Sequence, residues 1–471
     1  MSKWKKALGL LLACAMLVTC FTACSSTPAP AEDGSTGDGG TTNGDTVSSN
    51  KDYDLYIFQF KVEIQEQLEE AVAAFEKENN IKIRLENAGG GVSYNDLLPS
   101  TMQKEDKPGL YTLINPSEAE RYFDYAADLS DTAAYKNLSD PSIVDAMTID
   151  GKVCGIPYTV EGGGVIYNKE LLSKVAGADI EGVDTTSLDT IVTSMRQSFD
   201  AYKNVVEYVQ AHKDEIGVKG AFSVPGKIVW NHAQHMAGAA TSRAYANEKE
   251  VLDAATLSDD AAARLTDLQA TYDLYINNAT MSGAEINTLD YDLGVNEFAM
   301  GESVFLQQGD WAYIAIANVM ENASENLGFL PIPYNNSALD GDEKAADHDR
   351  LPTGVPAYWA INSQVSEEEQ QWAAKFLEYI YVEHLNDIAV NEFGFTAPYK
   401  GVEPAEDNPL AADIMMYMEE GKTIGWTHNA YPTGWSDNVL GPDIQKYTAG
   451  ATTWEDLVTN AVNGWAEYKS R

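Results

Sequence analysis

Cysteine and basic side chains are scarce in this chain of 471 residues. Three of its four cysteines, Cys14, Cys20 and Cys24, lie close together near the N-terminus, and Cys154 stands alone in the remainder. No disulfide is therefore available within the later part of the chain, and we expect Cys154 to be a small buried hydrophobe. Lys and Arg number 31 against 72 Asp and Glu, a formal net charge of −41. Such acidity excludes nucleic acid as a partner and disfavours a highly anionic ligand.

The sequence also lacks internal repeats and the short motifs of several enzyme classes. Gly-x-Ser-x-Gly, His-Glu-x-x-His and a complete phosphate-binding loop are all absent, so we interpret the run Gly89-Gly90-Gly91 as a turn. The absence of repeats disfavours a surface adhesion protein. His232 and His235 are three residues apart, as some metal ligands are, but no Cys or acidic residue completes a local site. We expect neither a metal nor another cofactor.

The first 50 residues predict an export signal and a tether. Residues 1–23 have lysines, then an apolar run over 7–18, then small residues, as a signal peptide does. Phe21-Thr22-Ala23-Cys24 resembles a bacterial lipobox, which predicts acylation of Cys24; an ordinary secretory signal is the alternative. The apolar run is too short to span a membrane. Residues 24–50 are polar and rich in Ser, Thr and Gly, which predicts a flexible tether. We therefore expect attachment to the extracellular face of the membrane through a lipid only.

From Tyr53 onward, strand patterns alternate with amphipathic helices. The run Tyr53–Phe58 predicts a strand, residues 64–75 a helix, and residues 81–85 a second strand. This is a βαβ unit, which predicts a mostly parallel sheet. Ligands of α/β sheets bind outside the carboxyl ends of strands, so Gln59 is expected at the mouth of a cleft.

Residues 151–172 contain a tight turn, Ile156-Pro157, Glu161, three glycines and Tyr167-Asn168-Lys169. The proline and the glycines predict that the chain bends at Glu161 instead of continuing one sheet. The spacing alone fits a turn with a solvated Glu161 equally well. The whole stretch resembles the first interlobe crossing of extracellular solute-binding proteins of carbohydrate ABC transporters, the maltose-binding-like family 1. Cys154 departs from the aromatic residue often found there, and the triple glycine is more permissive than usual.

The similarity extends from about Tyr53 to the C-terminus and implies the architecture. We expect an α/β fold of two lobes with three interlobe crossings and a ligand cleft, which a hinge motion closes. Lobe 1 would comprise residues 51–158 and 359–405, and lobe 2 residues 159–358 and 406–471. The resemblance implies a monomeric, lipid-anchored subunit that binds a carbohydrate, with an oligosaccharide favoured. Its partners would be the transmembrane permease subunits of an ABC importer.

The resemblance also implies which residues contact the ligand. The strand–Gly–x–Trp element at Gly309-Asp310-Trp311 and the segment Trp230-Asn231 would supply aromatic and polar contacts. Glu118 follows a predicted strand at 110–114, although it is equally suited to stabilise its own helix. Trp372 is expected in the core instead. The full set of expected ligand contacts is Gln59, Glu118, Tyr158, Glu161, Trp230, Asn231, Asp310, Trp311, Trp426 and Trp435.

These residue types suit a sugar because a sugar ring has apolar C–H faces and a rim of hydroxyls. An indole covers the face, while carboxylates and amides satisfy the rim. Two alternatives remain at this point. One is a receptor for a non-sugar solute such as a peptide, which would need partners for backbone amides and termini. The other is a surface glycoside hydrolase with Glu161 and Asp310 as paired carboxylates, although we do not expect an enzyme.

Overall fold

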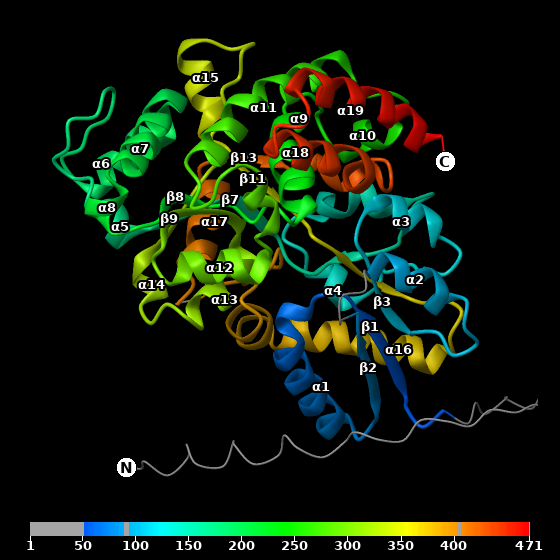
Figure 1. Ribbon diagram of the computed structural model, residues 1–471. Helices are drawn as coiled ribbons and strands as arrows, with labels where there is room; N and C mark the ends of the chain where they lie inside the picture. Colours follow the sequence, from blue (N-terminus) through cyan, green and yellow to red (C-terminus); the bar gives the residue numbers. More distant parts are fainter. Residues whose placement is uncertain (1–50, 89–93, 404, 406, 471) are drawn as a thin grey trace, which may run out of the picture. The chain divides into compact units, whose positions relative to one another are not determined.

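Two separate β-sheets, each covered by helices, make up the part of the chain that the computed structural model describes, residues 51–88, 94–403, 405 and 407–470 (Figure 1). The predicted signal peptide, the tether, Cys24 and the turn at Gly89–Gly91 lie outside the described residues. No helix within the described ranges is long and apolar enough to cross a membrane.

The first sheet has the strand order β2-β1-β3-β12-β6. Its strands are β1 (Leu55–Gln59), β2 (Ile83–Asn87), β3 (Leu110–Leu113), β6 (Ile156–Pro157) and β12 (Tyr358–Ile361). The β1 strand pairs in parallel with β2 and β3, which confirms the predicted βαβ unit. A separate hairpin of β4 (Thr148–Ile149) and β5 (Lys152–Val153) turns at Asp150 and Gly151, whose φ angles are 50° and 83°. The expected tight turn is therefore present.

Helices around this sheet are blue, cyan and gold in Figure 1. They are α1 (Gln65–Asn79), α2 (Tyr94–Met102), α3 (Pro116–Arg121), α4 (Ala133–Lys136) and α16 (Glu367–Glu378), with the shorter or irregular η1 (Val62–Ile64), η2 (Pro141–Met147), η6 (Tyr379–Glu383) and η7 (Leu385–Glu392). The apolar stripe of α1, Leu68, Val72 and Phe75, is buried in the first core. Trp372, expected there too, packs against this core at its partly exposed margin.

The second sheet has the order β13-β11-β7-β9-β8, and β10 pairs with the far half of β7. Its strands are β7 (Glu161–Asn168), β8 (Gly220–Ser223), β9 (Ser303–Gly309), β10 (Leu327–Leu330), β11 (Leu351–Gly354) and β13 (Thr423–Gly425). The β7 strand is antiparallel to β9, β10 and β11, so it is the centre of this sheet.

The second sheet is covered by the remaining helices, green to red in Figure 1. The α-helices are α5 (Lys169–Ser173), α6 (Leu188–Gln197), α7 (Phe199–Ala211), α8 (Lys213–Ile216), α9 (Ala237–Thr241), α10 (Glu248–Asp253), α11 (Asp259–Asn277), α12 (Tyr291–Ala299), α13 (Tyr313–Ala317), α14 (Ala323–Asn326), α15 (Gly341–His348), α17 (Pro409–Glu419), α18 (Gly441–Thr448) and α19 (Trp454–Lys469). The irregular ones are η3 (Asn231–Met236), η4 (Gly283–Thr288), η5 (Asp310–Ala312), η8 (Thr427–Ala430) and η9 (Ser436–Leu440).

The chain crosses between the two sheets three times, as predicted. Residues 158–160 join β6 to β7, and residues 355–357 join β11 to β12. The third crossing starts beside the first, where Thr396 bridges to Val160, and it ends at α17. Strand registers show that, in each sheet, the strand ends next to the crossings are aligned; we call this side of each sheet its crossing edge. Gln59, Asn87 and Leu113 end their strands on the first edge; Glu161, Gly309, Gly354 and Gly425 lie on the second.

The chain leaves the first sheet just before Glu161, as predicted, but the three glycines do not form the bend, because Glu161 and all three glycines belong to the continuous strand β7. None of the three has a positive φ. Two of them permit close packing: a Cβ at Gly164 would lie 2.4 Å from the Leu330 carbonyl oxygen, and one at Gly162 would lie 2.7 Å from Ile414. A Cβ at Gly163 would meet its nearest neighbour, His235, at 3.5 Å, an ordinary contact.

Glu118 stabilises the turn between β3 and α3. Its carboxylate accepts a hydrogen bond of 2.7 Å from the Ile114 backbone N–H, and the Asn115 side chain caps the helix by accepting from the Glu118 N–H at 3.0 Å. The Glu118 residue is 7% exposed. Burial raises the pKa of its carboxyl from 4.5 to about 7, although the Ile114 N–H bond and Arg121 oppose the shift.

We predict that Gly164→Ala lowers the free energy of unfolding by about 1–3 kcal/mol, because the methyl group must displace a backbone oxygen. The matched change Gly163→Ala should alter it by less than about 1 kcal/mol, since no clash follows. Denaturant unfolding of the two variants measures the difference. Equal losses would show that the close packing of β7 does not depend on Gly164.

A second prediction concerns pH. Because the native pKa of Glu118 is about 7 and lies above its unfolded value, the native state retains the proton more strongly, and stability falls as pH rises between those values. In the Glu118→Gln protein, the fall in the free energy of unfolding with rising pH should be smaller by up to about 3 kcal/mol. The amide of this variant still accepts the hydrogen bond from the Ile114 N–H. Melting curves of both proteins between about pH 5 and pH 8 test it. Parallel pH profiles would contradict the assignment, since general charge repulsion affects both proteins alike.

Candidate functional site

Three tryptophans gather at the crossing edge of the second sheet. Trp230 precedes η3, Trp311 follows β9, and Trp426 follows β13. The ring centroids of Trp230 and Trp311 are 6.1 Å apart, as are those of Trp311 and Trp426. Trp230 and Trp311 are partly exposed, whereas Trp426 is 4% exposed. We call these three residues the tryptophan cluster.

Glycines at the strand ends allow two of these indoles to fold over the sheet edge. A Cβ at Gly309 would lie 2.0 Å from the Trp311 ring, and one at Gly354 would lie 2.5 Å from the Trp426 Cβ. Neither ring could keep its place beside a larger residue. The Trp311 indole N–H donates to the Gln308 side chain at 3.1 Å, which fixes the orientation of the ring.

Two carboxylates lie at the same edge and are both held by the protein. Glu161 pairs with the Lys61 ammonium at 2.5 Å, and both residues are buried. Asp310 accepts a hydrogen bond of 3.0 Å from the Gly162 backbone N–H. Burial raises the pKa of Asp310 well above its usual range, and the neighbouring Glu161 raises it further. The site therefore offers polar groups in a largely desolvated surrounding, where unpaired partners are costly.

A cavity of about 20 Å³ lies between the lobes beside Lys61, Glu161, Asp310 and Trp311. Such a space accommodates about one water molecule. A sugar ring at Trp311 therefore requires the lobes to separate. This requirement agrees with a cleft that opens and closes about the crossings.

A larger cavity of about 1060 Å³ adjoins the cluster on the side of Trp426, Gly354 and Gly425, and extends between η2 and the segment 242–249. Of the predicted ligand contacts, only Trp426 lines it. Cavity size alone would favour this space as the binding site. We place the candidate site at the tryptophan cluster instead, because the partly exposed faces of Trp230 and Trp311 and both carboxylates converge there.

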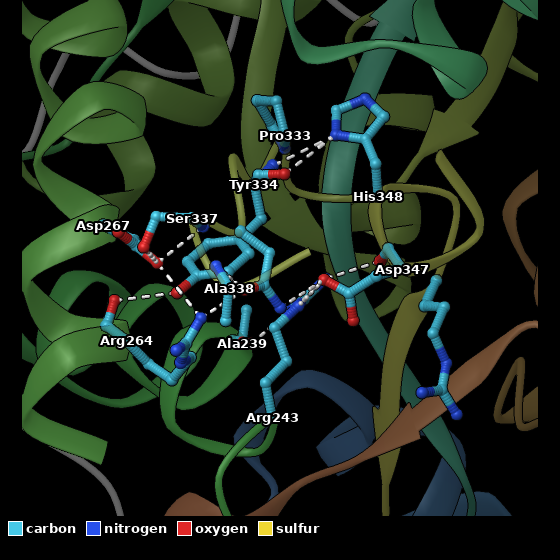
Figure 2. Close-up of polar contacts among 12 residues, drawn as sticks. Ala239, Arg243, Arg264, Asp267, Pro333, Tyr334, Ser337, Ala338, Asp347 and His348 are labelled. Atoms are coloured by element: carbon cyan, nitrogen blue, oxygen red, sulfur yellow. Dashed lines mark hydrogen bonds and ion pairs between the residues drawn. The ribbon is translucent and has the colours of Figure 1, made fainter. Parts of the chain in front are cut away.

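The wall of the larger cavity contains a polar network that the protein satisfies by itself (Figure 2). The Arg243 guanidinium donates to Asp347 at 2.7 Å and lies 4.3 Å from the centroid of the Tyr334 ring. Arg264 contacts Asp267 at 3.2 Å and donates to Asn336. These arginines connect α9, α11 and α15, so their role in the structure is to brace the second lobe.

Three predicted contacts are engaged inside the protein. The Gln59 amide is fully buried and bonds to Lys61, Asn87 and Tyr158, so it organises the end of β1. Tyr158 is also fully buried and stacks on Trp359, with ring centroids 4.0 Å apart. Asn231 is 0% exposed and donates to the Gln307 carbonyl at 3.2 Å. Their burial corrects the expectation that they contact the ligand directly.

Trp435 is the clearest correction. It is 0% exposed, its ring packs 4.9 Å from that of Trp465, and its indole N–H donates to the Ala461 carbonyl at 2.9 Å. A fully packed, hydrogen-bonded indole has no face left for a sugar. Glu118 likewise lines neither cavity and bonds to its own turn.

Two further residues at the cluster were missed by the sequence reasoning. His235 lies with its ring centroid 4.9 Å from that of Trp311, and His428 lies 5.1 Å from Trp426. The pair His232 and His235 was weighed only as a metal site, but His232 contacts the Met236 sulfur and the Tyr272 ring instead. The sequence feature that could have indicated His235 as a site residue is its proximity to Trp230.

Comparisons with known proteins agree with this architecture. Among curated proteins, none matches the sequence. Solved structures do: a chitin oligosaccharide binding protein has a TM-score of 0.67 and 18% identity, over 88% of this chain and 99% of that one. The protein RafE in complex with raffinose has a TM-score of 0.66 and 19% sequence identity, over 88% of this chain and 100% of that one. Maltose-bound MalE3 of T. maritima gives 0.60 and 20%, over 88% and 99%.

Identities this low show the fold alone, which is the two-lobed α/β fold of solute-binding proteins. The family evidence comes from the sequence itself. The profile of a family described as bacterial extracellular solute-binding protein matches residues 70–414, well over half of the chain. The chain therefore belongs to the bacterial extracellular solute-binding protein family.

Proposed function

We propose that this protein captures a carbohydrate, with an oligosaccharide favoured, between its two lobes and delivers it to an ABC importer. The family consists of extracellular solute-binding proteins, and structural neighbours are named for raffinose, stachyose, maltose and chitin oligosaccharide. We also propose that the protein is a monomer and that it contacts the permease subunits of the importer.

The tryptophan cluster is the observation that carries this proposal. Trp230 and Trp311 present partly exposed indole faces at the crossing edge, with the Asp310 carboxyl next to Trp311 along the chain. Indole faces cover the C–H faces of sugar rings, and carboxyl groups satisfy hydroxyls. Several indoles provide more than one stacking face, which favours a ligand of more than one ring.

The same geometry disfavours the two alternatives. A peptide requires groups that pair with its termini, but the Lys61 ammonium at the edge is paired with Glu161. A glycoside hydrolase requires one carboxylate as nucleophile or base. Here Glu161 is paired with Lys61, and Asp310 accepts from the Gly162 backbone N–H. We therefore propose binding without hydrolysis, and a bound oligosaccharide should be recovered at its original length.

We predict that Trp311→Ala weakens carbohydrate binding by about ten- to a hundredfold. Covering half of an indole removes about 100 Å² from water, worth about 2.5 kcal/mol before ordering costs. A thermal-shift panel of raffinose, stachyose, maltose and chitin oligosaccharides first selects a ligand. Titration calorimetry then compares the variant with the parent protein.

Trp435→Ala serves as the matched control. Its ring is a core element, so the change should lower the free energy of unfolding by about 3–5 kcal/mol and leave binding by the folded fraction unchanged. Normal binding by the Trp311→Ala protein, or a selective binding loss in the Trp435→Ala protein, would contradict our placement of the site.

We also propose that Cys24 is the acylated N-terminus of the mature protein. The lipobox-like sequence Phe21–Cys24 and the polar segment 25–50 support this proposal, together with an extracellular family. Stable membrane attachment requires two acyl chains, or one chain with a second signal. The tether would then allow the binding lobes to reach the permease.

Cys24→Ala should move the protein from the membrane fraction to the culture medium, because the acyl acceptor is lost. Immunoblots of both fractions measure the distribution. A Trp435→Phe protein carried through the same fractionation controls for release that follows from any altered protein. Retention of the Cys24→Ala protein at the parent level would refute acylation as the anchor.

A further inference from the structure

The helix that follows Trp230 has the same type of hydrogen bonding as η6, η7 and η9 among the described residues. η3 (Asn231–Met236) is a π-helix, a rare conformation that occurs often at functional sites. It leads directly from the tryptophan cluster into α9. Its fifth residue, His235, is partly exposed, whereas Asn231 and His232 are buried.

Aromatic rings surround the His235 imidazole. Its centroid lies 5.4 Å from that of Trp230, 4.9 Å from that of Trp311 and 5.0 Å from that of Trp426. His428 lies 4.8 Å away on a further side. His235 is therefore the polar centre of the tryptophan cluster, in contact with each of its members.

Buried polar atoms without partners are concentrated here. Within the described ranges, fifteen buried side-chain nitrogen and oxygen atoms lack a hydrogen-bond partner, and eight of them belong to η3, β9 and the segment 426–428. His235 Nδ1, Trp426 Nε1 and His428 Nδ1 are among these eight atoms. Each such atom destabilises the protein if it stays unsatisfied. The three atoms that belong to the aromatic rings of this surface, those of His235, Trp426 and His428, point to a polar partner from outside the protein.

Next to His235 there is room for a single carbon-sized atom in ordinary van der Waals contact. Gly163 of β7 has no side chain, and a Cβ there would lie 3.5 Å from His235 Nδ1 and 3.8 Å from the Trp426 ring. Two of the unpartnered atoms, His235 Nδ1 and Trp426 Nε1, thus border the same glycine. The main chain of β7 does not fill the position.

Both imidazoles are uncharged at neutral pH. Burial lowers the pKa of His235 to about 3, and burial together with His235 lowers that of His428 well below its usual range. A neutral imidazole has one donor and one acceptor nitrogen, as a hydroxyl group needs. A neutral ring supplies no positive charge to balance a carboxylate or sulfate, so this surrounding suits an uncharged hydroxylated ring better.

We propose that His235 is a specificity-determining residue of the carbohydrate site, whose neutral imidazole hydrogen-bonds hydroxyl groups of an uncharged sugar ring stacked on the tryptophan cluster. The Trp426 indole N–H supplies a second donor at the same place, and the His428 ring packs against that of His235. This inference rests on the proposed function and adds to it the residue that selects hydroxylated, uncharged rings.

His235→Phe tests the inference, because it keeps an aromatic ring and removes both nitrogens. We expect affinity for the selected carbohydrate to fall ten- to a hundredfold in titration calorimetry. The ligand-free melting temperature should stay level or rise, since an unpartnered buried nitrogen disappears. His235→Gln, which keeps a donor and an acceptor, should recover part of the affinity.

His232→Gln is the matched control, three residues away in η3 and packed against Tyr272. It should change stability and leave affinity unaltered. If the parent protein binds no carbohydrate of the panel, the proposed function fails and this inference fails with it. If the parent binds but His235→Phe binds equally well, only this inference is overturned. This inference alone is also overturned if His235→Phe lowers the melting temperature and His235→Gln restores the melting temperature but not the affinity.

Discussion

The close approach of β7 to its neighbours is the constraint on which the second lobe depends. This strand pairs with β9 on one side and with β10 and β11 on the other, and its glycines admit the Leu330 carbonyl and Ile414 at distances no side chain would allow. Because Glu161 begins the same strand, its carboxylate is placed at the crossing edge by packing deeper in the sheet. The glycines that the sequence suggested as a bend are thus a packing requirement.

Charged side chains at the crossing edge beside β7 are buried away from water, and the structure compensates for the lost solvation. Buried charges are destabilising unless they are paired, and here the Lys61 ammonium of the first lobe neutralises Glu161 at the start of the second. The pair connects the two lobes directly at a crossing. The proposed separation of the lobes would expose this pair to water, whose solvation would replace the lost contact. Opening of the cleft would therefore break the ion pair between Lys61 and Glu161.

The fold followed from the sequence because alternating strand and helix patterns are local, and the family motif fixed their order along the chain. The site followed only in part. Trp426 and Trp435 are both indoles near the C-terminus, and no local pattern distinguishes them. What decides between them is distant in sequence: Ala461 and Trp465 enclose Trp435, whereas Gly354 leaves room for Trp426 at the sheet edge. Gln59 and Tyr158 lie at the crossing edge, but their polar groups are bonded to other groups of the protein.

Histidine at the centre of the cluster has a physical logic that composition alone does not reveal. A chain with a net charge of −41 repels anionic solutes at long range, and its site adds no unpaired cation that would attract them at short range. In the proposed site, selection among neutral sugars would then depend on hydrogen bonds, for which burial keeps the imidazole uncharged. The aromatic rings that we propose for stacking also exclude the water that would stabilise a charged imidazolium at His235. Stacking and hydroxyl recognition would therefore have one common cause, the desolvation imposed by the tryptophan cluster.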